Sequence, residues 1–141
     1  MNNRGVIVRT PAKINLQLAV GPIGADGFHE VTTVFQAISL FDDVTLKFAA
    51  ENSGIAITLS GATSNGVPAT DENLAVRAAK LMADKYDLST DLAIHLKKEI
   101  PVAGGMAGGS ADAAGVIVAM DALFEIGLSR AEMEAIAAQL G

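Results

Sequence analysis

The sequence predicts an α+β domain with helices packed on one face of a largely antiparallel sheet. Three observations support this. Most strand-like segments, in which apolar and polar residues alternate, lie in the first half of the chain, and the segments with helical spacing lie mainly in the second half. No repeat, low-complexity tract or linker interrupts the 141 residues. That length is typical of one domain with a core of its own.

The first half of the chain is rich in strand patterns with a period of two. Pro11 separates the first two strands, and the turn cluster GPIGADG covers residues 21–27. The alternation places Lys13, Asn15 and Gln17 together on the face opposite the apolar one. We expect strands over residues 6–9, 14–20, 31–40, 44–48 and 55–59.

Three helices and one more strand complete the predicted order. Thr70, Asp71 and Glu72 supply a capping residue and an acidic first turn for a helix through about Tyr86. A strand over 92–97 follows, and then a helix that starts near Ser110. Ser129 with Glu132 forms a capping box for a last helix that reaches Leu140.

The segment PVAGGMAGGSADAA, residues 101–114, has the composition of a phosphate-binding loop. Its four glycines allow successive main-chain N–H groups to turn toward an anion, and the helix that follows adds the positive end of its dipole. The loop has no Walker A lysine and does not fit G-x-G-x-x-G. A bound phosphate would therefore need a cation from elsewhere. The alternative is a glycine-rich turn between a strand and a buried helix.

Composition excludes several classes of function. The formal net charge of −6 argues against a nucleic-acid partner. The chain has no cysteine, which excludes disulfides and thiolate sites. The spacing of His29 and His95 supports no metal site. No apolar run reaches the ~18 residues of a membrane span, and no secretory signal is visible. We expect a cytoplasmic protein without a membrane partner.

Four motifs together resemble the N-terminal half of the GHMP small-molecule kinases, which include galactokinase, homoserine kinase and mevalonate kinase. They are PAKINLQLAVG at 11–21, DGFHE at 26–30, TDENL at 70–74 and the glycine loop. The resemblance covers essentially the whole chain. It implies the GHMP kinase N-terminal domain fold, which is ribosomal protein S5 domain 2-like, with ATP and Mg²⁺ as cofactors. PAKINL with DGFHE points to the member that phosphorylates the 2-hydroxyl of a cytidine diphosphate-linked methylerythritol in non-mevalonate isoprenoid biosynthesis.

The resemblance also implies roles for particular residues. Lys13 matches the family's active-site lysine, which would supply the missing cation. Asn15 would contact the substrate or Lys13, while Phe28 and His29 would hold cytosine by stacking and polar contact. The family more often has tyrosine at the position of Phe28. The nucleotide contacts implied are Pro101, Gly104, Gly105, Met106, Ala107, Gly108, Gly109, Ser110, Asn73 and Lys98.

Several of these residues also have simpler interpretations. Lys13 and Lys98 could be solvated lysines at strand ends, and His29 a turn histidine bonded to backbone. Asn73 could be only a helix-start residue, and Ser110 only a helix cap. Asp112 could help to bind a metal through water, or could only favour the first turn of its helix.

We expect residues 1–141 to form the N-terminal ATP-binding domain of this kinase. In the family, a segment with the catalytic aspartate and a C-terminal domain follow, and neither lies within these residues. The chain alone is therefore expected to have negligible kinase activity. The alternatives are another GHMP kinase, of homoserine or mevalonate type, and a non-catalytic nucleotide-binding module.

Overall fold

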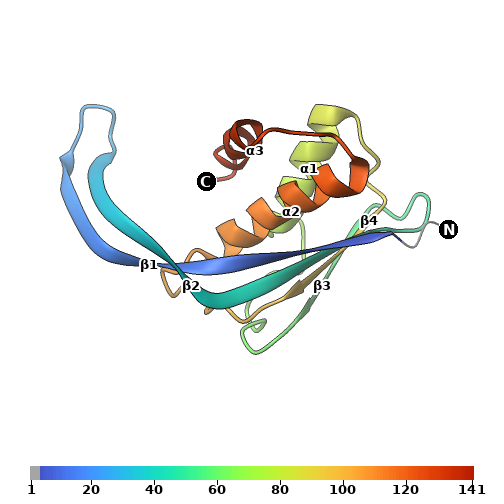
Figure 1. Ribbon diagram of the computed structural model, residues 1–141, viewed down its shortest axis with the longest axis horizontal. Coiled ribbons are helices and arrows are strands. Elements are labelled where there is room, and N and C mark those ends of the chain that lie inside the picture. Colours follow the sequence, from blue (N-terminus) through green and yellow to red (C-terminus); the bar gives the residue numbers. More distant parts are fainter. Residues whose placement is uncertain (1–3) are drawn as a thin grey trace.

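The computed structural model describes residues 4–141, which form a four-stranded sheet with three helices on one face (Figure 1). The strand order is β1-β2-β4-β3, with β1/β2 and β2/β4 antiparallel and β3/β4 parallel. The predicted α+β class and largely antiparallel sheet are confirmed. The elements are β1 (Gly5–Ile23), β2 (His29–Phe48), β3 (Ile55–Ser60), α1 (Leu74–Tyr86), β4 (Leu92–Lys97), α2 (Gly108–Phe124) and α3 (Arg130–Ala137).

Strands β1 and β2 are much longer than expected. The predicted break at Pro11 is wrong, because β1 runs through this residue and absorbs it at a register shift between Pro11 and Lys13. Strand β1 is the edge of the sheet, where a missing N–H is tolerated. Beyond the shift, β1 and β2 continue as a curved two-stranded ribbon that extends past the helices (Figure 1). We call residues 13–37 the arm.

A second register shift in the arm corrects the expected grouping of polar side chains. Asn15 pairs with Phe35, but Gln17 pairs with Val34, so the register changes between them. Successive residues of β2 point to opposite faces, and paired residues share a face. Gln17 therefore lies on the face opposite Asn15, whereas Lys13 and Asn15 share one face as expected.

The start of α1 also differs from the prediction. Residues 70–72 precede the helix, and Asn73 is the capping residue, whose Oδ1 accepts a hydrogen bond of 2.9 Å from the Ala75 N–H. The first turn of α1 contains no acidic residue. Helix α3 has the predicted capping box between Ser129 and Glu132, but it ends at Ala137 rather than Leu140.

The core lies between the helices and the helix-facing side of the sheet. Helix α2 packs on α1, β1 and β2. Its approach to the sheet depends on Gly115, where a Cβ atom would lie 2.7 Å from Thr10 Cγ2 and 2.9 Å from Val44 Cγ2. The largest fully buried side chains are Leu46, Met82, Leu92, Ile94, Leu96, Ile100, Ile117, Met120, Ile136, Val44, Val76 and Val116. Over residues 4–141, no helix is both long and apolar enough to cross a membrane.

Replacing Gly115 by alanine is expected to destabilise the domain, because the added methyl group meets two buried β-branched side chains. We expect a loss of about 1–3 kcal/mol in the free energy of unfolding, measured by urea denaturation. Gly109→Ala is the matched control in the same helix, because its Cβ would lie 3.7 Å from Leu74 Cδ1. That variant should change stability by no more than about 1 kcal/mol. Equal stability of the two variants would contradict the close packing of α2.

Candidate functional site

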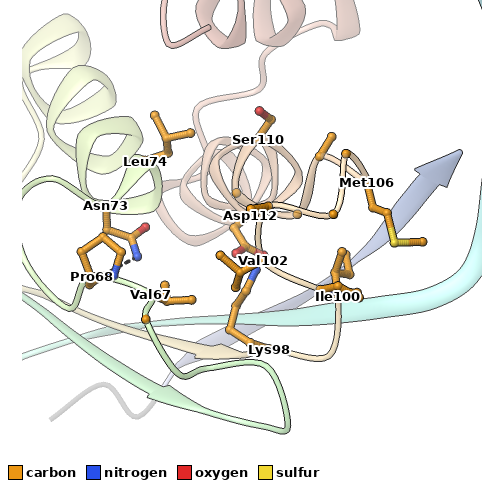
Figure 2. Close-up of a pocket in the computed structure, with 18 of the residues that line it drawn as sticks. Val67, Pro68, Asn73, Leu74, Lys98, Ile100, Val102, Met106, Ser110 and Asp112 are labelled. Atoms are coloured by element: carbon orange, nitrogen blue, oxygen red, sulfur yellow. Dashed lines mark hydrogen bonds and ion pairs between the residues drawn. The ribbon is translucent and has the colours of Figure 1, made fainter. Parts of the chain in front are cut away.

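A pocket of about 360 Å³ lies between the glycine loop and the start of α1 (Figure 2). Four segments line it: residues 66–68 before α1, residues 72–74 at the start of α1, the segment from Lys98 through the glycine loop, and the first turns of α2. Val67, Pro68, Leu74 and Val102 give part of the wall an apolar character. All the residues predicted from the resemblance to contact nucleotide line this pocket: Asn73, Lys98, Pro101, Gly104, Gly105, Met106, Ala107, Gly108, Gly109 and Ser110.

The glycine loop has a backbone suited to an anion. Ala103, Gly105 and Ala107 all have positive φ, at 58°, 69° and 58°. A left-handed alanine is unfavourable, so two of them in one loop indicate a conformation imposed by the surrounding structure. Alternation between left-handed and other conformations turns successive N–H groups toward a common centre.

Helix α2 begins at Gly108, two residues earlier than expected. Its capping residue, Ala107, makes no side-chain cap, and the predicted capping role of Ser110 is wrong because this residue lies within the first turn. The first intrahelical hydrogen bond runs from the Ala111 N–H to Ala107 O. The N–H groups of Gly108, Gly109 and Ser110 therefore have no partner within the helix, and they lie at its positive end beside the pocket.

Lys98 is buried and paired, which corrects the interpretation of a solvated strand end. Its side chain is 3% exposed, and its Nζ forms ion pairs with Asp42 Oδ2 and, at 2.5 Å, with Asp112 Oδ2. Asp42 Oδ1 also accepts hydrogen bonds from the N–H groups of Glu99, at 2.6 Å, and Ile100, at 2.9 Å. We call Asp42, Lys98 and Asp112 the buried triad.

Asp112 is the least satisfied member of the buried triad. Its Oδ1 is buried and has no hydrogen-bond partner among the described residues. Burial raises the pKa of Asp112 to about 6, and the neighbouring Lys98 ammonium only partly opposes that increase.

Sequence reasoning missed Asp42. The signal that could have found it is a break in the pattern of β2. Val44 and Leu46 face the core, and two residues before them the same face carries an aspartate that is fully buried. A carboxylate on a core face requires a buried partner, and Lys98 is that partner.

Lys13 lies beside the loop but does not line the pocket. Its main-chain N–H donates to Met106 O at 3.2 Å. Its ammonium is turned along the arm, donating to Asn15 Oδ1 at 2.8 Å and lying 5.1 Å from the centre of the Phe35 ring. Asn15 Nδ2 in turn donates to Thr33 Oγ1 at 2.7 Å. The predicted proximity of Lys13 and Asn15 is therefore present.

Phe28 and His29 lie at the far end of the arm. Phe28 is 75% exposed, and the His29 Nδ1 lies 2.8 Å from Gly21 O. At ~3.3 Å per residue, the strand from Lys13 to Gly21 spans at most about 26 Å. The sequence-predicted residues thus fall into two regions, a pocket at the glycine loop and a row of side chains along the arm.

Asn73 uses both of its side-chain polar atoms within the protein. Its Nδ2 donates to Pro68 O at 2.8 Å, while its Oδ1 caps α1. The residue is 8% exposed and lies at the pocket wall (Figure 2). The interpretation as a helix-start residue is correct, and the side chain also fixes the turn that carries Pro68.

Comparisons with known proteins agree with this geometry. The family model for the GHMP kinases N terminal domain matches residues 73–141. A protein of Mycolicibacterium vanbaalenii named 4-diphosphocytidyl-2-C-methyl-D-erythritol kinase is 52% identical over 136 residues, an alignment that covers 96% of this chain and 41% of that protein.

Solved structures share the fold. The crystal structure of a 4-(cytidine 5'-diphospho)-2C-methyl-D-erythritol kinase is 34% identical, with a TM-score of 0.73 over 96% of this chain and 46% of that one. The chain has the fold of a GHMP kinase N-terminal domain. A homoserine kinase from Cytophaga hutchinsonii, 15% identical, has a TM-score of 0.71 over 99% of this chain and 42% of that one. At that identity the likeness shows the fold alone.

The resemblance found in the sequence is therefore confirmed, both to the GHMP kinases and, more narrowly, to the N-terminal part of the diphosphocytidyl methylerythritol kinases. The chain spans less than half the length of the curated relative described above.

The raised pKa of Asp112 predicts a pH dependence of stability. The folded value of about 6 lies above the ordinary aspartate value of 3.8, so between these values the folded state binds more protons than the unfolded state. The contribution of Asp112 to stability is thus complete below pH 4 and is lost as the pH rises through 6. The loss should be on the order of 3 kcal/mol.

The Asp112→Asn variant should lack this loss, because an amide does not titrate. Its free energy of unfolding relative to the parent chain, measured by urea denaturation at intervals from pH 4 to pH 7.5, should increase with pH. A difference that stays constant over this range would show that Asp112 is ionised in the folded state throughout.

Proposed function

We propose that the chain is the ATP-binding N-terminal domain of a kinase that phosphorylates the 2-hydroxyl of 4-diphosphocytidyl-2-C-methyl-D-erythritol in non-mevalonate isoprenoid biosynthesis. The observation that carries this proposal is the 52% identity, over 96% of the chain, to a protein with that name. The catalytic aspartate and a C-terminal domain would come from the rest of the protein. The cytoplasmic location expected from the sequence stays a prediction.

The glycine loop would hold the phosphates of ATP. Its inward N–H groups and the unpaired N–H groups of the first turn of α2 are donors for phosphate oxygens, and the helix dipole favours negative charge there. The nucleoside would lie against the apolar wall made by Val67, Pro68, Leu74 and Val102. Asn73 would shape this wall through its hydrogen bond to Pro68 O.

Mg²⁺ would accompany the nucleotide and neutralise charge on the transferred phosphate. The fit of the site to this ion is supported by Asp112, a pocket-lining residue whose buried Oδ1 has no hydrogen-bond partner among residues 4–141. Ser110, which also lines the pocket, could supply a hydroxyl oxygen after a rotation of its side chain. Oxygen atoms of this kind are the ligands that Mg²⁺ prefers, directly or through water.

The arm would bind the alcohol substrate. Phe28 would stack on cytosine and His29 would contact its edge at the far end, while Asn15 would contact the sugar alcohol near Lys13. The arm thus has candidate contacts for a nucleobase at one end and for a reacting hydroxyl at the other. Lys13 would stabilise the charge that develops between ATP and that hydroxyl.

Two alternative functions predict different results. A kinase of homoserine or mevalonate type would need no cytosine contact, so a cytidine nucleotide would not compete with its substrate. A non-catalytic module would bind ATP without transferring phosphate. The much lower identity to the homoserine kinase, 15% against 34% and 52%, favours the diphosphocytidyl substrate.

Nucleotide binding at the loop is tested by titrating Mg-ATP into the isotope-labelled chain. Amide signals of residues 104–110 should shift in a saturable way, because their N–H groups would donate to phosphate. Signals on the edge strand β3, such as that of the exposed Ala56, provide the internal control. Saturation without any change at residues 104–110 would contradict the assignment of the phosphate site.

The role of Lys13 is tested in the complete protein encoded by the reading frame that contains this chain. Lys13→Met should lower kcat by about 100-fold or more, because one preorganised charge at the reacting centre is lost. Lys47→Met, which removes an exposed lysine of β2, should leave kcat within about twofold of the parent value. Equal kcat for both variants would remove Lys13 from the mechanism.

A further inference from the structure

The buried triad connects the two ends of the glycine loop to the sheet. Lys98 and the two residues after it lead into the loop, and Asp112 lies in the helix that leaves it. Asp42 of β2 holds the ammonium of Lys98 and the N–H groups of residues 99 and 100. Asp112 binds the same ammonium from the other side of the loop. The glycine loop is therefore held in place at both of its ends.

The ammonium of Lys98 lies directly beneath the start of α2. A Cβ atom at Gly108 would lie 3.4 Å from Lys98 Nζ and 3.1 Å from Ile100 Cγ2. Lys98 and Asp112 belong to the floor of the pocket, whereas Asp42 does not line it. The view into the pocket places Lys98 and Asp112 together below the loop (Figure 2).

Asp42 and Lys98 of the buried triad are already paired. Asp42 is saturated, with Oδ2 on the ammonium and Oδ1 on two N–H groups. The ammonium already faces two carboxylates, so its charge is neutralised before any ligand arrives. A lysine in this state is a poor contact for a phosphate, since a new contact would have to compete with two buried anions.

We propose that Asp42 is a positioning residue for nucleotide binding, which fixes the entrance of the glycine loop through Lys98 and the N–H groups of residues 99 and 100. Lys98 acts in the same unit and makes no direct contact with phosphate. The part of this inference that concerns ATP rests on the proposed function. The part that concerns the loop's conformation does not.

The Asp42→Asn variant separates the two functions of this carboxylate. An amide has one oxygen, which can satisfy either Lys98 or the two N–H groups but not both. We expect faster amide hydrogen exchange at Glu99 or Ile100, and Mg-ATP binding weakened about tenfold, the effect of one lost buried hydrogen bond. If Lys98 contacted phosphate directly, the same substitution would free its charge and would tighten binding.

The double variant Asp42→Asn/Lys98→Met provides the rescue. With a neutral residue at 98, the amide oxygen can serve both N–H groups, and Asp112 can compensate for the missing ammonium by taking up a proton. Slow exchange at residues 99 and 100 should return, and Mg-ATP affinity should come within about threefold of the parent, since the loop's hydrogen bonds are restored. A direct phosphate contact by Lys98 predicts the reverse, a double variant at least as weak as the single one.

Asp43→Asn is the matched control. Asp43 is the next residue of β2, and its carboxylate pairs with Arg9 on the surface at 3.0 Å. It should change neither exchange at residues 99 and 100 nor Mg-ATP affinity. If Asp42→Asn does not fold, the double variant alone decides between the two interpretations.

Each remaining outcome supports or overturns the proposal. Asp42→Asn that exchanges and binds like the parent would overturn it, as would a double variant without rescue. If the parent chain does not bind Mg-ATP, the nucleotide-binding function fails. In that case exchange at residues 99 and 100 still tests whether Asp42 fixes the loop.

Discussion

One buried ammonium group fixes the geometry of the functional end of this domain. Transfer of a charged side chain out of water costs several kcal/mol, and only well-placed counter-charges offset the cost. Lys98 has two of them, supplied by β2 and by α2. A shift of either element would leave a charge buried and unpaired. The sheet, the helix and the loop between them are thus held in one arrangement.

The arm is constructed differently. It is a two-stranded ribbon, and the apolar side chains Leu16, Leu18, Val20, Ile23, Phe28, Val31 and Phe35 are all more than half exposed along it. An isolated ribbon of this kind is only marginally stable. Its order depends on continuity with the sheet at Thr10 and Asp42, where side chains are buried. The domain therefore combines a rigid pocket with an arm that is anchored at one end only.

The sequence predicted the fold well where the determining interactions are local. Alternation identified β3 and β4, and Ser129 with Glu132 identified the capping box, because each of these patterns depends on neighbouring residues alone. The start of α1 was harder to predict, since Thr70, Asp71 and Asn73 are all good capping residues and only the structure shows that Asn73 is the cap. The continuity of β1 through Pro11 and the altered face of Gln17 depend on register shifts against β2, which no local pattern reveals.

The same distinction applies to the site. The glycine loop was visible in the sequence because its composition is unusual. Asp42 was not, because its partners at residues 98–100 are more than fifty positions away. The motif resemblance identified Lys98 as part of the site but could not show which of its atoms are already in use. Burial and hydrogen-bond capacity supply that information only after the chain has folded.

The charge balance of the pocket follows from these contacts. Within the buried triad, two carboxylates pair with one ammonium. When both carboxylates are ionised, the triad beneath the loop has no net positive charge that could attract a phosphate. A polyphosphate in this pocket has to be stabilised by main-chain N–H groups, the dipole of α2 and cations from outside the floor. The main-chain N–H of Lys13 donates to Met106 O in the glycine loop, but its ammonium is directed along the arm toward Asn15. The cation that arrives with the nucleotide therefore has to carry much of the neutralisation, and the buried, unpaired Oδ1 of the pocket-lining residue Asp112 would assist it.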